Sequence, residues 1–84
     1  MTWLWVKGLR IRVQMNALGE PLQIRWDGRV HGVVWVANRW RVDLRWWRTR
    51  IWREYFKLAT DTHYLLVVYR DLLTGKWYLQ RLYD

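Results

Sequence analysis

The sequence predicts an all-β fold, a small antiparallel barrel or curled sheet of about six to seven strands connected by hairpins. Apolar and polar residues alternate along most of the chain from residue 9 onward, which is the period of a half-buried strand. Turn signals built on Gly, Pro, Asn or Asp recur about every 8–12 residues, a spacing typical of small barrels and sandwiches. The chain has 84 residues, which is enough for one domain.

The first half of this domain reads as a three-stranded meander. Residues 9–14, 22–26 and 29–36 alternate in polarity and form its strands. Residues 16–21 contain Gly and Pro and make the first turn, because Pro cannot continue a central strand. Asp27-Gly28 makes the second turn, since a two-residue type I′ hairpin needs φ > 0 at both positions.

The second half continues the pattern with denser apolar residues. We expect a fourth strand over residues 40–47 and a basic connector over 48–51, although the tryptophans of residues 44–55 also permit a helix if they pack on one side. The remaining strands are expected at residues 52–58, 63–70 and 77–83, with turns between them at residues 60–62 and 71–76.

Residues 1–8 stand apart from the single small β domain expected over residues 9–84. They are either an extra edge strand or an exposed arm that docks on a partner or on a second copy, because an unpaired apolar edge invites pairing. In the second case Trp3 and Trp5 would contact the partner, and a homo-oligomer is possible. This opening is too short for a signal peptide and lacks its basic start, so we expect a cytoplasmic protein.

Composition bounds both the core and the partners. Nine Trp, five Tyr and one Phe supply large side chains for the core, and aromatic packing must hold the fold together, since the chain has no cysteine for disulfides or thiolate-bound zinc. The net charge of +8 includes twelve arginines and indicates a polyanion or an acidic protein surface as partner. No stretch reaches the roughly 18 consecutive apolar residues of a membrane span, so no membrane partner is expected.

The residues that catalysis needs are scarce. Ser and Cys nucleophiles are absent from the chain. The two histidines, His31 and His63, have no cluster of Cys or carboxylates around them in sequence, so neither a metal nor another cofactor is expected. Most acidic residues lie in predicted turns, where Asp favours hydrogen bonds to its own backbone. We therefore expect a protein that is not an enzyme.

Residues 39–53 form the strongest local anomaly in the chain. They hold six arginines and four tryptophans in fifteen positions. Arginine holds phosphates in a bidentate manner, and exposed indoles stack on bases. The candidate nucleic-acid-binding residues are therefore Arg39, Arg41, Arg45, Trp47, Arg48, Arg50, Trp52 and Arg53.

The same segment has a purely structural reading. Trp40 and Trp46 lie on the apolar side of the alternation and are expected in the core, whereas Trp47 shares the side of Arg45 and is expected to be exposed. Trp52 could belong to either group. The arginines could bind phosphates, or they could form a solvated face with some guanidinium groups stacked on indoles.

The second half of the chain also carries a series of ordered aromatic landmarks. These are Trp46-Trp47, Arg53-Glu54-Tyr55-Phe56, Tyr69-Arg70-Asp71, Thr74-Gly75-Lys76-Trp77-Tyr78-Leu79 and Leu82-Tyr83-Asp84. Together they resemble the C-terminal module of ImuB, the Y-family polymerase-like component of the bacterial mutagenic translesion-synthesis cassette. Small free-standing bacterial proteins look alike over residues 9–84, including the Gly19-Glu20-Pro21 turn and the Trp40-Arg41 pair.

The resemblance implies an accessory role in DNA damage tolerance. Because the net charge is +8, single-stranded or primer-template DNA is the first expected partner, and docking on an error-prone polymerase or an ImuB-like hub, through Trp3, Trp5 and Trp47, is the alternative. The chain departs from the module's pattern in three places. Residues 39–42 replace an expected Gly-Pro-Glu-Arg, Glu54 replaces Asp, and Gln80-Arg81 replaces His-Gly.

Overall fold

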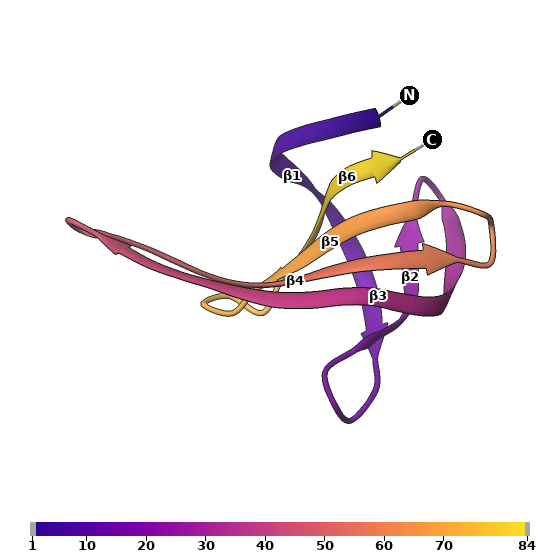
Figure 1. Ribbon diagram of the computed structural model, residues 1–84, viewed down its shortest axis with the longest axis horizontal. Coiled ribbons are helices and arrows are strands. Elements are labelled where there is room, and N and C mark those ends of the chain that lie inside the picture. The colour runs from indigo at the N-terminus through magenta and orange to yellow at the C-terminus, as the bar shows by residue number, and fades with distance from the viewer. Residues whose placement is uncertain (1, 84) are drawn as a thin grey trace.

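A computed structural model describes residues 2–83, and it shows six antiparallel strands in a sheet that closes on itself (Figure 1). This confirms the predicted all-β class, the hairpin connections and the strand number. The ring runs in chain order, and β1 closes it by pairing with β6. The strands are β1 (Thr2–Met15), β2 (Pro21–Trp26), β3 (Arg29–Trp46), β4 (Thr49–Thr60), β5 (Leu65–Asp71) and β6 (Trp77–Tyr83).

The two longest strands, β1 and β3, each pair with one neighbour over part of their length and with another neighbour over the rest. The first half of β1 pairs with β6 and its second half with β2, and the β6 ladder is interrupted by an irregularity between Leu4 and Leu9. The start of β3 pairs with β2, and the rest of β3 pairs with β4. Residues 2–8 are therefore part of β1, with Trp3 opposite Leu82. They do not form an N-terminal extension separate from the sheet.

The turn chemistry agrees with the sequence. Asp27 and Gly28 have φ values of 54° and 71°, as a type I′ turn requires. In the first turn, the side-chain oxygen of Asn16 accepts hydrogen bonds from the backbone N–H groups of Leu18 and Glu20 at 2.9 and 3.0 Å. These contacts fix the meander of β1, β2 and β3.

Two expectations about the middle of the chain are wrong. The strands expected at 29–36 and 40–47 are one strand, β3, because two irregularities near Val34 and Ala37 absorb the extra residues without ending the pairing with β4. The basic connector at 48–51 is not a connector, since Trp47 and Arg48 alone make the turn and β4 starts at Thr49. The helical alternative for residues 44–55 is also excluded, because they form strands and a turn.

The core fills the ring with side chains from several strands. Its buried members are Ile11, Ile24, Phe56, Leu58, Leu66, Val68, Trp77, Leu79 and Leu82. Leu9 and Leu22, the first apolar positions of the alternation predicted over residues 9–14 and 22–26, remain more than one third exposed. Residues 2–83 contain no helix with the length and apolar character that crossing a membrane requires.

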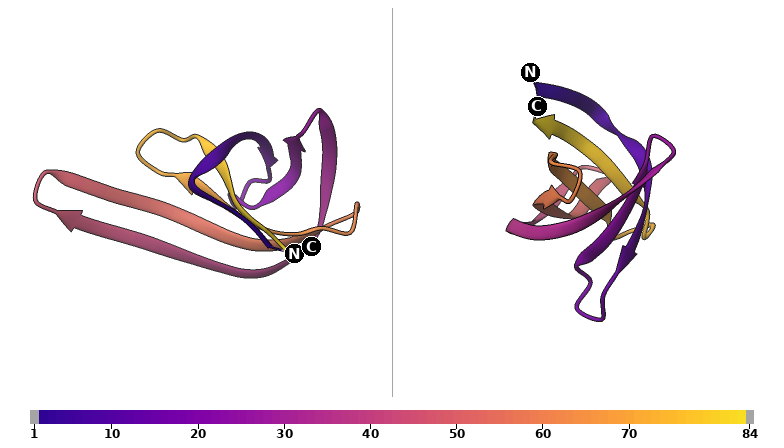
Figure 2. Two further views of the ribbon diagram at one scale, coloured as in Figure 1. Left: turned by 90° about the horizontal axis from the view of Figure 1, so that it is seen from above. Right: turned by 90° about the vertical axis from the view of Figure 1, so that its right-hand side faces the viewer.

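The end of the β3–β4 hairpin lies outside this core. Figures 1 and 2 show β3 and β4 continuing together as a long ribbon beyond the other strands. The molecule is 41 Å along its longest axis, and its radius of gyration of 12.6 Å exceeds the value of about 11.9 Å expected for a compact domain of this length. The ribbon therefore projects from a compact body.

Candidate nucleic-acid interface

The projecting ribbon contains most of the anomalous segment found in the sequence, residues 43–52, and residues 39–42 and 53 form its base. We call residues 39–53 the arm. The last pair between β4 and β5 joins Arg53 to Asp71, whereas β3 and β4 stay paired out to Trp46 and Thr49. Beyond Arg53 the ribbon is therefore only two strands wide, and Leu44, Arg45 and Trp46 near its end are all exposed.

Cross-strand register divides the arm into two faces. Opposite residues share a face, and successive residues alternate between faces. One face, the arginine face, carries Arg39, Arg41, Asp43, Arg45, Arg50 and Trp52. The other, the apolar face, carries Trp40, Val42, Leu44, Trp46, Ile51 and Arg53. The structure thus brings five of the predicted site residues together and places Arg53 on the opposite face.

Trp47 and Arg48 form the tip between the two faces. Trp47 is 92% exposed, which agrees with its predicted exposure. Its φ of 57° lies in the left-handed region, which is uncommon for a bulky side chain and costs about 1–2 kcal/mol. Gly, Asn or Asp would fit this turn more easily. A strained and fully exposed indole at the end of a projecting ribbon is a reason to look for function there.

The expectation that Trp40 and Trp46 belong to the core is wrong. Trp40 is 37% exposed and Trp46 is 80% exposed. Both lie on the apolar side of the alternation, as predicted, but Trp46 lies beyond the part of the ribbon that pairs with β5. Trp40 stacks on Tyr55 with 5.3 Å between ring centroids and 6° between ring planes. The arm therefore presents exposed indoles at Trp40, Trp46 and Trp47.

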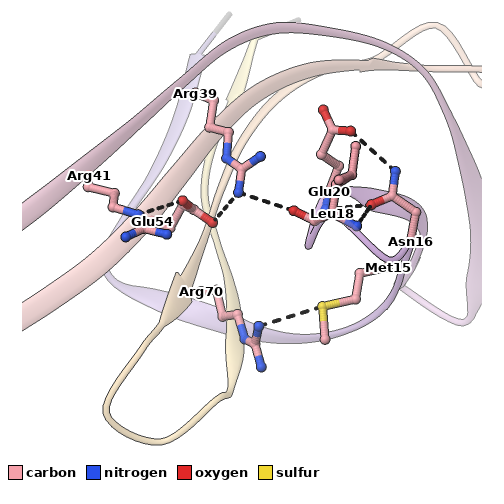
Figure 3. A network of polar contacts seen from close by, with 8 residues as sticks. All are labelled: Met15, Asn16, Leu18, Glu20, Arg39, Arg41, Glu54 and Arg70. Atoms are coloured by element: carbon pink, nitrogen blue, oxygen red, sulfur yellow. Dashed lines mark hydrogen bonds and ion pairs between the residues drawn. The ribbon is translucent and has the colours of Figure 1, made fainter.

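Acidic residues neutralise part of the arginine face (Figure 3). Arg39 and Arg41 donate hydrogen bonds to the two carboxylate oxygens of Glu54 at 3.0 and 2.8 Å. Arg50 pairs with Asp43 at 3.3 Å. Within residues 2–83, Arg45 and Arg48 take part in no ion pair, so they are the arm's most available cations.

Glu54 lies at the base of the arm with only 7% of its side chain exposed. Burial acts to raise the pKa of its carboxyl group, but the hydrogen bonds and positive charges of Arg39 and Arg41 outweigh burial and hold the pKa below its ordinary value of 4.5. Arg39 also donates to the backbone oxygen of Leu18 at 3.3 Å. Arg39 thereby ties the base of the arm to the first turn of the meander.

This shift predicts acid sensitivity. A carboxyl group whose pKa is lower in the folded state stabilises that state above its unfolded pKa, and the stabilisation is lost as the pH falls through 4.5 toward the folded value. We expect the free energy of unfolding to fall over this range, and we expect part of the fall to be absent in Glu54→Gln. Urea titrations of both proteins between pH 3 and 7 measure it. Parallel pH profiles would contradict the assignment to Glu54.

Trp52 and Arg53 make cation–π contacts that hold the base of the arm. The Arg50 guanidinium lies 4.6 Å from the ring centroid of Trp52, which is partly buried. The Arg53 guanidinium lies 4.4 Å from the Tyr69 ring and donates to the Tyr55 hydroxyl at 3.2 Å. Each contact contributes about 0.5–1 kcal/mol at such partly exposed sites. Trp52 and Arg53 are therefore less available to a ligand than the tip.

An aromatic row crosses the outer face of the sheet and was not predicted from the sequence. Trp40, Tyr55, Tyr69 and Tyr78 lie directly opposite one another on β3, β4, β5 and β6. Successive ring centroids are 5.1 to 5.3 Å apart. Only the pairing register, which the sequence does not give, places these four residues in one line. It joins the apolar face of the arm to the body of the domain.

The other predicted partner-binding residues are on β1. Trp3 is 52% exposed, whereas Trp5 is partly buried and packs against the main core. Among residues 2–83, no group of three or more His, Cys, Asp or Glu side chains is arranged to hold a metal ion. No family model, curated protein or solved structure matches the chain, so its function must be inferred from its own side chains.

Proposed function

We propose that this chain is a non-catalytic DNA-binding protein that holds single-stranded or primer-template DNA with its arm. The observation that carries the proposal is a projecting ribbon with exposed indoles at Trp40, Trp46 and Trp47 and with Arg45 and Arg48 close to the same tip. Indoles stack on unpaired bases, and each stacked base contributes about 1–3 kcal/mol. Arginines hold the phosphates on either side.

The shape of the arm supports DNA with accessible bases. A two-stranded ribbon is narrow enough for a DNA groove, and an aromatic side chain at its tip acts as a wedge between base steps. A wedge gains most where stacking is already broken, as at a primer-template junction or in a single strand. The resemblance to the ImuB module supports a setting in translesion synthesis, with an accessory role beside a polymerase in the cytoplasm.

A salt titration tests the proposal. We expect a labelled 20-nucleotide single strand and a primer-template to bind more tightly than a blunt duplex. The logarithm of the single-strand affinity should fall with the logarithm of salt concentration, with a slope of about −0.7 for each phosphate contacted. Fluorescence anisotropy with each DNA between 50 and 500 mM salt measures this. An absent interaction at 50 mM salt, or one that salt leaves unchanged, would exclude DNA as the ligand.

The apolar face of the arm favours one alternative. Val42, Leu44 and Ile51 accompany the exposed indoles there, and aliphatic side chains give bases no stacking platform. They would suit a protein surface, with the arginines steering the approach to acidic residues of an error-prone polymerase or an ImuB-like hub. Leu44→Thr separates the two functions, since it should weaken a protein complex and leave DNA affinity within twofold.

A further inference from the structure

A second group of arginines lies on the body of the domain, on the outer face of β1 and β2. Arg12 stands directly opposite Arg25, and Arg10 is two residues before Arg12 on the same face. Like charges placed directly opposite one another on a sheet destabilise it. All three side chains belong to exposed residues. The arrangement therefore costs stability unless an anion lies between the guanidinium groups.

The surface at these arginines is hollowed. One hollow of about 250 Å³ is lined by Arg12, Gln14, Gln23 and Arg25, with Val13 and Val30 beside them. A second, of about 330 Å³, is lined by Arg10, Ile11, Arg12 and Arg25. Both hollows share the Arg12–Arg25 pair. Guanidinium and amide N–H groups are donors that suit phosphate oxygens.

No acidic side chain compensates this group within the part of the chain that the structure describes. The ion pairs found there involve Arg39, Arg41 and Arg50 of the arm. Neither hollow has an acidic lining residue. From the opposed charges, the hollows and the lack of nearby acids, we propose that Arg10, Arg12 and Arg25 form a second phosphate-binding site, which holds the backbone of the DNA strand that the arm engages. This inference rests on the proposed function.

The register gives a route between the two sites. The aromatic row that begins at Trp40 ends at Tyr78, which is opposite Arg10. Four strand spacings of about 4.8 Å make this path about 19 Å long. Tyr69 donates a hydrogen bond to the backbone oxygen of Lys7 at 3.2 Å, so β1 covers the row at Tyr69. The DNA strand would therefore pass over Lys7 at this point.

The length of this route sets the length of DNA required. From Trp40 to Trp47 the arm adds seven residues at about 3.3 Å each, or about 23 Å. The whole path of about 42 Å corresponds to about 12 nucleotides at the duplex rise of 3.4 Å per nucleotide, and to fewer in a more extended strand. A 20-nucleotide strand can therefore reach both sites, whereas a 4-nucleotide strand cannot.

The double variant Arg12→Gln/Arg25→Gln tests the second site. We expect its affinity for a 20-nucleotide single strand to fall about fivefold at 0.1 M salt for each phosphate that the variant no longer holds, with a salt slope shallower by about 0.7. Its affinity for a 4-nucleotide strand bound by the arm should stay within twofold. Its melting temperature should rise by about 1–6 °C, because the repulsion is removed. A purely structural role would not weaken DNA binding while raising stability.

Arg29→Gln/Lys76→Gln is the matched control, since it removes two exposed positive charges that line neither hollow. Equal losses for the two double variants would overturn the inference and leave only long-range attraction. Unchanged binding of the 20-nucleotide strand by Arg12→Gln/Arg25→Gln would also overturn it. The same holds if this variant loses affinity for inorganic phosphate but keeps its affinity for DNA. In these cases the arm could still bind DNA. Failure of the wild-type protein to bind any DNA would instead remove the proposed function itself.

Discussion

Trp47→Asn should weaken single-strand binding by about 5- to 150-fold without lowering the stability of the fold. The loss follows from the indole, because one stacked base contributes about 1–3 kcal/mol. Stability should be unchanged or higher, since the φ of 57° at this position suits Asn far better than Trp. Trp47 is also 92% exposed, so the substitution removes no buried side chain. Anisotropy with a 20-nucleotide strand and thermal unfolding measure the two effects.

Trp35→Thr is the control for this variant. Trp35 is also exposed and also lies on β3, but it is outside the arm. We expect its removal to change DNA affinity less than twofold. If Trp35→Thr and Trp47→Asn weakened binding equally, exposed tryptophans would act without regard to position and the arm would lose its special role. If Trp47→Asn bound DNA normally, the indole at the tip would not contact bases.

The sequence predicted the parts of this fold that depend on neighbouring residues. Asp27-Gly28 specified its turn because both positions need φ > 0, which is a local requirement. The alternation of Trp40 to Trp46 correctly gave the two faces of the ribbon. It could not show that β3 and β4 continue beyond Arg53, where the pairing of β4 with β5 ends, so that Leu44 and Trp46 lie outside the body of the domain and are exposed. Whether a face is buried depends on a neighbour that the alternation does not contain.

The exposure of Trp47 was predicted for an incomplete reason. Its place on the arginine side of the alternation suggested exposure, but the residue lies in the turn and on neither face. The turn was hidden because Trp-Arg carries none of the usual turn residues. Long β3 was hidden for the opposite reason, since Ala37-Asn38 looks like a strand end and is only an irregularity in the ladder.

Pairing across strands was beyond sequence reasoning. The contact of Arg41 with Glu54 requires that residue 41 lie opposite residue 54, and this register is set by the two-residue turn at Trp47 and Arg48. The aromatic row depends on two further registers as well. The candidate arginines could thus be named from the sequence, but the distinction between paired and available ones could not.

Glu54→Gln should have opposite effects on stability and on DNA binding. The variant removes a buried carboxylate that accepts from Arg39 and Arg41 at 3.0 and 2.8 Å. Hydrogen bonds to charged groups contribute about 1.5–3 kcal/mol, but the Arg41 side chain is 61% exposed and can be hydrated once it is released. We therefore expect the free energy of unfolding to fall by about 1–3 kcal/mol, measured by urea denaturation at pH 7.

The same variant should bind single-stranded DNA more tightly. It leaves Asp43 as the one acid among residues 39–54 and frees two guanidinium groups on the arginine face. If both take up phosphates, the salt slope should steepen by about 1.4, and the affinity at 0.1 M salt should rise by up to about 25-fold. Anisotropy at a temperature where the variant is folded measures this, and weaker binding by the folded variant would show that the arginine face does not contact phosphates.

Asp43→Asn separates the electrostatic effect from the structural one. Its carboxylate is half exposed and pairs with Arg50 at 3.3 Å, a geometry that contributes only about 0–1 kcal/mol to stability. It should therefore tighten DNA binding with little loss of stability, whereas Glu54→Gln should show both changes. Because Glu54 orders Arg39 and Arg41 at the base of the arm while competing with DNA for them, a gain in affinity accompanied by a loss of stability is the result that assigns the arginine face to phosphate contact.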